Sequence, residues 1–441
     1  MVDTQPASRG FDWLLGACII GALAALLFVL LRGGEYLSIP QFALLLVGAP
    51  VVLIVALFAL RLWVPSLVPG ALLSLIAFVV AILAAEMAFI SGDVSVWGND
   101  DLFRDRAAFL AALGPSANPQ PNFFPKELVR RSGGEEYRSV LTGTKGELLP
   151  LAGVANATVA MCRDGDRVWQ PFQADEHGFP NPAGLWQSDE VRVLSVGDSH
   201  VQGWCVPPAQ SFMGLIAAAH PRTVNLGVGG NGPLANLALL REYGAVLRPK
   251  TVLWMFSLAT DVSDLDRERR TPILSGYMAA GYTQDLVTRQ DEIDRALKGY
   301  EALVSSPQGT RSIDWAEVAR RVFTLYDVRL RFRVDRGSVQ EVDYAFLRRL
   351  LEAARKEVEG WGGEMVFVFL PSQMALQDKA VGQTEVRDIV LDLRIPLIDV
   401  TPEFRAQPDP PAMFQAREGT HYSLTGHQLV ARTILSAIER Q

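Results

Sequence analysis

The sequence predicts an α/β fold in its C-terminal half, with a parallel sheet covered by helices on both faces, behind an all-α transmembrane segment of three helices. From residue 191 onwards, short apolar runs alternate with amphipathic stretches, which is typical of strands and helices in a parallel sheet. The first ninety residues contain three long, uncharged apolar runs, and 49% of the whole chain is hydrophobic. The 441 residues therefore divide into a membrane part and a globular part.

The three apolar runs cover residues 13–31, 37–60 and 62–85. Each is long enough to cross a hydrocarbon core of about 30 Å as a helix. A cleaved signal peptide is the alternative for the first run, but this run is too long and lacks a small-x-small cleavage site. We therefore expect a three-helix anchor over residues 1–92. Flanking charges do not decide the orientation of this anchor. We place the N-terminus in the cytoplasm and the globular part outside, on the basis of a candidate disulfide in the globular part and of the motifs that follow.

Two further parts follow the predicted anchor. Residues 93–190 are punctuated by Pro, Gly and Asn and are expected to form a stalk and a small strand-containing prelude. Residues 191–441 are expected to form the α/β domain, with a helical insertion at residues 262–363. Strands are predicted at 191–196, 223–226, 251–256, 364–370 and 396–400, and helices at 210–219, 233–247, 344–360 and 425–440. Reactive side chains in such a sheet gather at the carboxyl ends of the strands.

Composition excludes several classes of function. The net charge is −7 and no run of Lys or Arg stands out, so we do not expect a nucleic-acid-binding protein. The three cysteines form no Cys-x-x-Cys pair, and we expect neither a metal site nor a cofactor. Cys162 and Cys205 lie in the polar part of the chain. They form one disulfide if this part faces an oxidising compartment, or they are two buried thiols, and both alternatives stay open.

Two segments carry the residue types that acyl transfer through a serine needs. Gly-Asp-Ser-His at residues 197–200 directly follows the first predicted strand, where a tight turn can expose the Ser199 hydroxyl. Near the C-terminus, Glu418 precedes His421 by three residues, just ahead of the last helix. An imidazole can take the serine proton, and a carboxylate can hold that imidazole in the required tautomer. The two segments therefore indicate a serine nucleophile with a histidine base.

The ordered set of motifs resembles the SGNH/GDSL superfamily of esterases and acyltransferases. The set consists of Gly-Asp-Ser at 197–199, Asn-Leu-Gly-Val-Gly-Gly at 225–230, Thr-Asp at 260–261 after the third strand, and Glu-Gly-Thr-His at 418–421. The resemblance covers residues 170–441. It implies a flavodoxin-like sheet and chemistry on acyl esters.

The same resemblance implies a role for each motif residue. Ser199 is the nucleophile, His421 is the general base and later acid, and Glu418, where the family usually has Asp, orients His421. The backbone N–H groups of Ser199 and Gly230 supply two oxyanion donors. Thr260 stands where the family has Asn, so either its hydroxyl replaces the Asn side chain as a further donor or the enzyme is slow.

Other polar residues near the motifs are interpreted as structural. Asp198 is expected to stabilise the turn before the nucleophile, because Asp side chains commonly bond to nearby backbone groups in turns. His427 is expected to pack or cap at the start of the last helix. Asp264 and Asp266 are expected to form a solvated acidic loop rather than a cation site.

The resemblance, taken together with the predicted anchor, implies a membrane-anchored serine esterase or O-acyltransferase that acts on acyl esters of an envelope or extracellular polysaccharide or lipid. The expected location is the cytoplasmic membrane of a bacterium, with the catalytic domain in the periplasm. A transferase would need envelope assembly partners, because three helices are too few to transport an acyl donor. The alternative is a catalytically weakened domain that serves as a polysaccharide-binding or assembly subunit, and Thr260 favours it.

Overall fold

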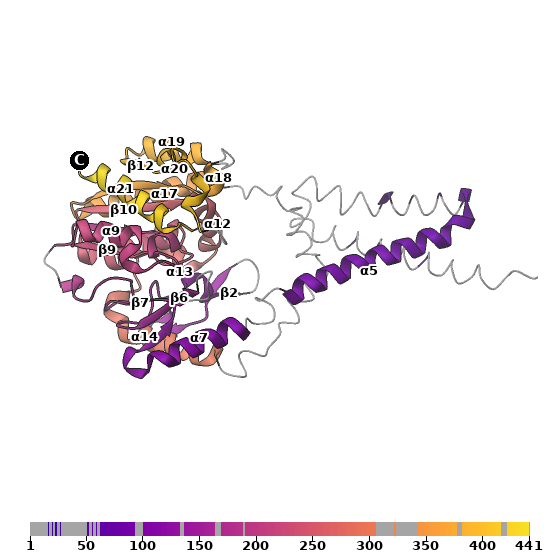
Figure 1. Ribbon diagram of the computed structural model, residues 1–441, viewed down its shortest axis with the longest axis horizontal. Helices are drawn as coiled ribbons and strands as arrows, with labels where there is room; N and C mark the ends of the chain where they lie inside the picture. Colours follow the sequence, from indigo (N-terminus) through magenta and orange to yellow (C-terminus); the bar gives the residue numbers. More distant parts are fainter. Residues whose placement is uncertain are drawn as a thin grey trace, which may run out of the picture. The chain divides into compact units, whose positions relative to one another are not determined.

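The computed structural model describes residues 62–92, 100–132, 136–163, 169–187, 190–305, 342–376, 382–415 and 421–440, together with single positions elsewhere. The chain forms two compact units. The first unit comprises residues 1–99 and 311–341, and the second comprises residues 100–310 and 342–441. Figure 1 labels the main helices and strands of the chain.

The described part of the first unit is helical. The 3₁₀ turn η2 spans Pro65–Leu67, and helix α5 follows over Val68–Gly92 with 25 residues. Among the described residues, no helix qualifies by length and hydropathy as a membrane span. The first two predicted spans lie almost wholly outside the described residues. The three-helix anchor is therefore not confirmed and stays a prediction.

A five-stranded parallel sheet forms the centre of the second unit (Figure 1). Its strands are β8 (Val193–Val196), β9 (Thr223–Asn225), β10 (Thr251–Ser257), β11 (Glu364–Leu370) and β12 (Leu397–Asp399). They lie in the order β9-β8-β10-β11-β12, and every neighbouring pair is parallel. This doubly wound order has its switch point between β8 and β10, where a crevice opens at the carboxyl ends of the strands. The predicted α/β class and its five strands are confirmed.

Helices cover both faces of this sheet. They are α8 (Ser199–Gln202), α9 (Phe212–Ala219), α10 (Pro233–Leu239), α11 (Ala245–Leu247), α12 (Leu258–Arg269), α13 (Pro272–Ser275), α14 (Gln290–Val304), α17 (Tyr344–Gly360), α18 (Gln373–Leu376), α19 (Gln383–Asp392), α20 (Thr401–Arg405) and α21 (Leu424–Ile438), with the π-helical turn η7 (Leu240–Gly244) after α10. Side chains of β10 alternate between the faces: Trp254 and Phe256 lie in one core cluster with α10 and α17, and Leu253 and Met255 lie in another with α9 and α21. A strand buried on both faces needs a continuous apolar run, which β10 has.

Residues 100–190 fold as part of the second unit. Their elements are α7 (Asp100–Leu113), a sheet of β1 (Pro119–Pro121), β6 (Thr158–Arg163) and β7 (Trp169–Gln173), and the pairs β2 (Val129–Arg131) with β3 (Tyr137–Ser139) and β4 (Thr142–Gly143) with β5 (Gly146–Glu147). Buried polar contacts join this prelude to β9. The Asn181 side chain accepts a hydrogen bond from the Asn225 N–H at 2.8 Å and donates to Asp175 at 2.8 Å. The prelude and the α/β sheet therefore share one core.

The predicted helical insertion is described in part. Its first half contains most of α12 and all of α13 and α14, whereas residues 306–341, apart from residue 322, lie outside the described residues. The described half packs against the prelude. Asp294 of α14 accepts a hydrogen bond from the Ala155 N–H at 3.0 Å, and the Gln284 side chain bonds to both backbone groups of Leu149 at 3.0 and 3.2 Å.

A disulfide joins Cys162 in β6 to Cys205 after α8, with the two Cα atoms 5.6 Å apart. This is one of the two alternatives that the sequence leaves open. The bond ties the prelude to the loop that also carries Trp204, which contacts the candidate site described below.

Replacing both cysteines by serine is expected to lower the free energy of unfolding by about 4 kcal/mol, because the disulfide closes a loop with a sequence separation of 43 residues. Urea unfolding followed by tryptophan fluorescence measures this change. The third cysteine of the sequence, Cys18, is not part of this bond, so Cys18→Ser is the matched control. A double variant as stable as the wild type would contradict the prediction.

His427 lies in the first turn of α21, and its Nδ1 accepts a hydrogen bond from the Phe212 N–H at 3.1 Å. Burial, helped by the neighbouring His200 and His421, lowers its pKa from 6.5 to about 3. A histidine with a lowered folded pKa stabilises the fold fully above its unfolded pKa and loses this contribution as the pH falls through the folded pKa.

We therefore expect the free energy of unfolding to fall by up to about 1.4 kcal/mol per pH unit as the pH drops from 6.5 towards 3. A His427→Gln variant should show a shallower decline, because it has no imidazole to protonate. Urea unfolding at a series of pH values measures both slopes, and equal slopes would contradict the assignment.

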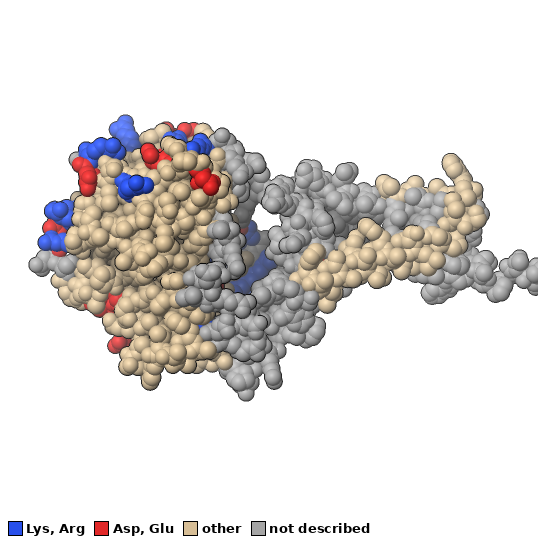
Figure 2. Space-filling model, in the orientation of Figure 1, with Lys and Arg blue, Asp and Glu red and all other residues tan. Residues whose placement is uncertain are grey.

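Charged side chains of both signs occur together on the described surface of the second unit. Figure 2 shows Lys and Arg beside Asp and Glu along the border of the visible face, around a broad area with few charges. Exposed ion pairs such as Arg348–Asp392, at 3.1 Å, belong to this surface. Pairs of this kind contribute at most about 1 kcal/mol each, so the stability of the unit comes from its apolar core.

Candidate active site

The turn between β8 and α8 presents Ser199 at the carboxyl end of the sheet. Gly197 and Asp198 form this turn, and Ser199 is the first residue of α8. Asp198 caps the helix, because its side chain accepts a hydrogen bond from the His200 N–H at 2.9 Å. Ser199 therefore lies at the switch point of the sheet, where doubly wound folds bind their ligands.

His421 faces Ser199 across this crevice. The Ser199 Oγ and the His421 Nε2 are 2.8 Å apart. The Trp204 ring stacks on the imidazole with a centroid distance of 5.5 Å and an interplanar angle of 29°. Ser423 caps α21 two residues further on, which fixes the backbone after His421. A histidine within hydrogen-bonding distance of a serine hydroxyl can take its proton.

Glu418, the predicted partner of His421, lies outside the described residues. The structure thus brings together two of the three predicted triad residues, and the role of Glu418 stays a prediction. A second imidazole, that of His200, lies with its centroid 5.2 Å from that of His421. Its Nδ1 is 3.0 Å from Asp198, so Asp198 orients His200.

Ser199 and Gly230, whose backbone N–H groups are the predicted oxyanion donors, line one cavity. Within the described part of the chain, neither the Ser199 N–H nor the Gly230 N–H donates a hydrogen bond, whereas the Gly229 N–H donates to the Gln202 side chain at 3.1 Å. Gly230 has a φ of +73°, a left-handed conformation that favours glycine. Both predicted oxyanion residues therefore line the site with unused donors.

Thr260 is placed differently from its predicted role. Its hydroxyl donates a hydrogen bond to Asp198 at 2.9 Å. A threonine hydroxyl carries a single proton, so Thr260 cannot also donate to an oxyanion in this arrangement. Burial alone would raise the pKa of Asp198, but His200 and the hydrogen bond from Thr260 lower it to about 2. Asp198 is therefore an ionised, buried carboxylate that contacts the His200 imidazole and accepts a hydrogen bond from the Thr260 hydroxyl.

Asp261 follows Thr260 and is also buried. Burial and the nearby charge of Asp198 raise its pKa well above the ordinary value. Its carboxyl group accepts a hydrogen bond from the Ser257 N–H, which fixes the end of β10. Asp264 and Asp266 lie in helix α12, so the expected solvated acidic loop is wrong. Asp264 is buried and pairs with Arg267, and Asp266 pairs with Arg270.

A cavity of about 240 Å³ opens beside Ser199 and His421. It is lined by Phe124, Lys126, Glu127, Ser199, Trp204, Gly229, Gly230 and His421. Three of these residues come from the prelude, for which no motif predicts a role. The prelude is fixed here by Asn122, which exchanges two amide hydrogen bonds with Gln202 of α8 at 3.2 and 3.1 Å. The wall of the cavity is therefore built partly by residues that sequence reasoning missed.

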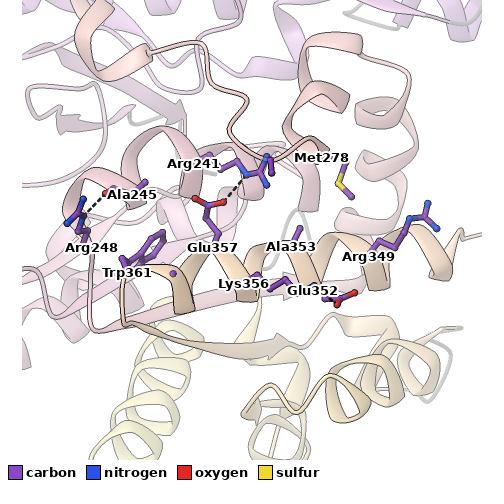
Figure 3. A pocket seen from close by; sticks show the side chains of 12 residues that line it. Arg241, Ala245, Arg248, Met278, Arg349, Glu352, Ala353, Lys356, Glu357 and Trp361 are labelled. Atoms are coloured by element: carbon purple, nitrogen blue, oxygen red, sulfur yellow. Dashed lines mark hydrogen bonds and ion pairs between the residues drawn. The ribbon is translucent and has the colours of Figure 1, made fainter.

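A second cavity, of about 730 Å³, has a different lining. Figure 3 shows charged side chains around this cavity, and the aromatic side chain of Trp361 also lines it. Arg241 pairs with Glu357 at 3.1 Å, and Lys356 pairs with Glu352 at 2.8 Å. None of its described lining residues is a serine, cysteine or histidine, so it offers no nucleophile and base of the kind found at Ser199.

Comparisons with known proteins give only distant matches. No protein-family profile and no curated protein matches the chain. Among solved structures, the chain is similar to a lipase/acylhydrolase from Enterococcus faecalis, with 15% identity over 56% of this chain and 95% of that chain and a TM-score of 0.31. A variant of an acetyl-xylooligosaccharide esterase from Geobacillus Stearmophilus has 16% identity over 57% and 94%, with a TM-score of 0.32. A GDSL-like lipase from Bacteroides thetaiotaomicron has 10% identity over 57% and 88%, with a TM-score of 0.30.

All three TM-scores are low, so these likenesses carry no weight for the function. The functional evidence is the geometry of the chain itself. That geometry is a doubly wound α/β unit whose switch point brings a serine hydroxyl and an imidazole into contact beside two unused backbone donors.

Proposed function

We propose that the second unit is a serine-dependent esterase or O-acyltransferase. The observation that carries this proposal is the 2.8 Å contact between the Ser199 Oγ and the His421 Nε2 at the wall of a cavity. A structural hydrogen bond alone would not need a cavity or the two unused N–H groups beside it. Together these features are the parts that acyl transfer through a serine requires.

The residues act in two steps. The Ser199 Oγ attacks the ester carbonyl while the His421 Nε2 takes the hydroxyl proton, and the N–H groups of Ser199 and Gly230 donate to the oxyanion. Collapse of the tetrahedral intermediate expels the alcohol, which receives the proton from His421. Water or an acceptor hydroxyl then attacks the acyl-enzyme, His421 takes its proton, and collapse releases the acyl product and returns that proton to Ser199.

The proposed substrates are acyl esters of an envelope or extracellular polysaccharide or lipid. The cavity of about 240 Å³ suits a short acyl group, because it is smaller than a typical pocket for a drug-sized ligand. The Cys162–Cys205 disulfide supports a periplasmic location, since such bonds persist in oxidising compartments. We propose that residues 1–92 anchor this domain to the cytoplasmic membrane, on the evidence of their apolar runs.

Hydrolysis of p-nitrophenyl acetate by the purified full chain, beside a Ser199→Ala variant, tests the proposal. Repeating the assay with an added sugar acceptor separates the two activities, because a transferase forms an acetylated sugar and an esterase releases acetate. A folded chain whose turnover does not depend on Ser199, with or without the acceptor, would contradict the proposal.

A catalytically weakened binding subunit is the second candidate. The observation that favours it is the hydrogen bond from Thr260 to Asp198, which removes one predicted oxyanion donor. Under this alternative, wild type and Ser199→Ala would bind a polysaccharide equally well and neither would turn over an ester. Isothermal titration with acetylated and deacetylated polysaccharide distinguishes the candidates.

A further inference from the structure

The oxyanion site has two backbone donors and no side-chain donor from Thr260. The Thr260 proton is committed to Asp198 at 2.9 Å. Loss of one oxyanion donor typically costs about 10²–10³-fold in rate. With this arrangement, a further hydrogen-bond donor to the oxyanion from elsewhere in the chain would raise the rate of the enzyme.

Lys126 lies against the glycine of this site. It belongs to the 3₁₀ turn η4 (Pro125–Glu127) of the prelude and lines the same cavity as Ser199. A Cβ atom placed on Gly230 would be 2.3 Å from the Lys126 Cε and 2.6 Å from its Nζ. The ammonium group therefore occupies the space directly beside the Gly230 Cα. The backbone N–H of the same residue is one of the two predicted oxyanion donors.

The backbone around Lys126 is held on both sides. Before it, Asn122 bonds to Gln202, and the Phe124 ring lies 5.8 Å from that of Trp204. After it, the Leu128 N–H donates to the Pro125 carbonyl at 3.1 Å, and the Leu128 side chain is buried. The turn thus positions the lysine stem at the cavity. Within the described residues Lys126 forms no close ion pair, but its charge acts on the carboxylates of Glu127 and Asp264, where it opposes the rise in pKa that burial causes.

We propose that the Lys126 ammonium is the third oxyanion donor, in the place that Thr260 does not fill. The inference rests on the proposed function. As the Ser199 Oγ–carbon bond forms, the carbonyl π pair moves to the oxygen, and a Lys126 N–H donates to that oxygen without transferring a proton. The electron pair on the oxygen re-forms the carbonyl bond when the alcohol leaves with the proton from His421. A charged donor forms a stronger hydrogen bond to an anion than a neutral amide, so Lys126 compensates for the missing Asn.

The test is p-nitrophenyl acetate hydrolysis by the full chain with Lys126→Met, Lys126→Arg and the surface control Lys145→Met. Lys126→Met should lower kcat by about 10²–10³-fold and leave KM nearly unchanged, because the oxyanion exists only after attack. Lys126→Arg keeps a charged donor and should stay within about 10-fold of wild type. Lys145, which pairs with Asp285 at 2.6 Å on the surface, should show no effect.

p-Nitrophenyl acetate is neutral. If Lys126 only bound an anionic part of the natural substrate, the Lys126→Met variant would hydrolyse p-nitrophenyl acetate with the kcat of the wild type. That result would overturn the inference. A rise in KM alone would overturn it as well. Thermal unfolding of each variant excludes loss of fold, and the labelling rate of Ser199 by a fluorophosphonate provides a second readout that should fall in Lys126→Met. A folded wild-type chain without Ser199-dependent turnover or labelling would overturn the proposed function and this inference with it.

Discussion

Replacing Ser199 by alanine is expected to lower kcat for p-nitrophenyl acetate by at least about 10⁴-fold, because the acyl-enzyme cannot form without the Oγ. His421→Ala should lower kcat by a similar factor, since no other described group contacts the Ser199 hydroxyl at hydrogen-bonding distance. The double variant should be no slower than either single variant, because the two residues act as one unit. Steady-state kinetics of the full chain measures all three values.

Matched controls separate catalysis from folding. Ser263→Ala removes an exposed hydroxyl that bonds to the Thr260 carbonyl in α12, and His220→Ala removes the imidazole at the end of α9. Both should keep nearly full activity. If the Ser199→Ala variant were as active as Ser263→Ala, the chemistry would not pass through this site.

Asp198→Ala is expected to lower the free energy of unfolding by about 3–5 kcal/mol. The buried carboxylate accepts hydrogen bonds from the His200 N–H and from the Thr260 hydroxyl, and its removal leaves both donors without this partner. The stabilising contribution of Asp198 should be fully present above about pH 3.8 and should be lost as the pH falls through the folded pKa of about 2. Urea unfolding at neutral pH and under acid conditions measures both effects.

Asp266→Ala provides the control for this prediction. Asp266 lies in α12 and pairs with Arg270 at a partly exposed position, so its removal should cost less than about 1 kcal/mol. Equal losses of stability for the two variants would show that Asp198 is not the centre of a buried network.

The sheet and the contact between Ser199 and His421 could be predicted from the sequence because both depend on local patterns. A buried parallel strand needs an apolar run, and β10 has one over Thr251–Ser257. Ser199 follows β8 after a two-residue turn and His421 lies three residues before α21, so the topology of the sheet brings them to the same crevice.

The rest of the site depends on contacts between distant segments. Lys126 and Asn122 come from a part of the chain without any motif, and only the packing of the prelude against α8 brings them to the cavity. Thr260 occupies the predicted position, but the direction of its single proton is decided by Asp198, whose charge no sequence pattern reveals. The pairing of Cys162 with Cys205 likewise required their distance, which spacing alone does not define.

Covalent labelling of the full chain with a fluorophosphonate, followed by peptide mass spectrometry, tests the central claim most directly. A serine activated by an imidazole attacks such a reagent, whereas an ordinary hydroxyl does not. We expect one adduct, on the peptide that contains Ser199, with no label in Ser199→Ala and much slower labelling in His421→Ala. Labelling of a different serine, or no labelling of a chain shown to be folded, would contradict the assignment of Ser199 as the nucleophile.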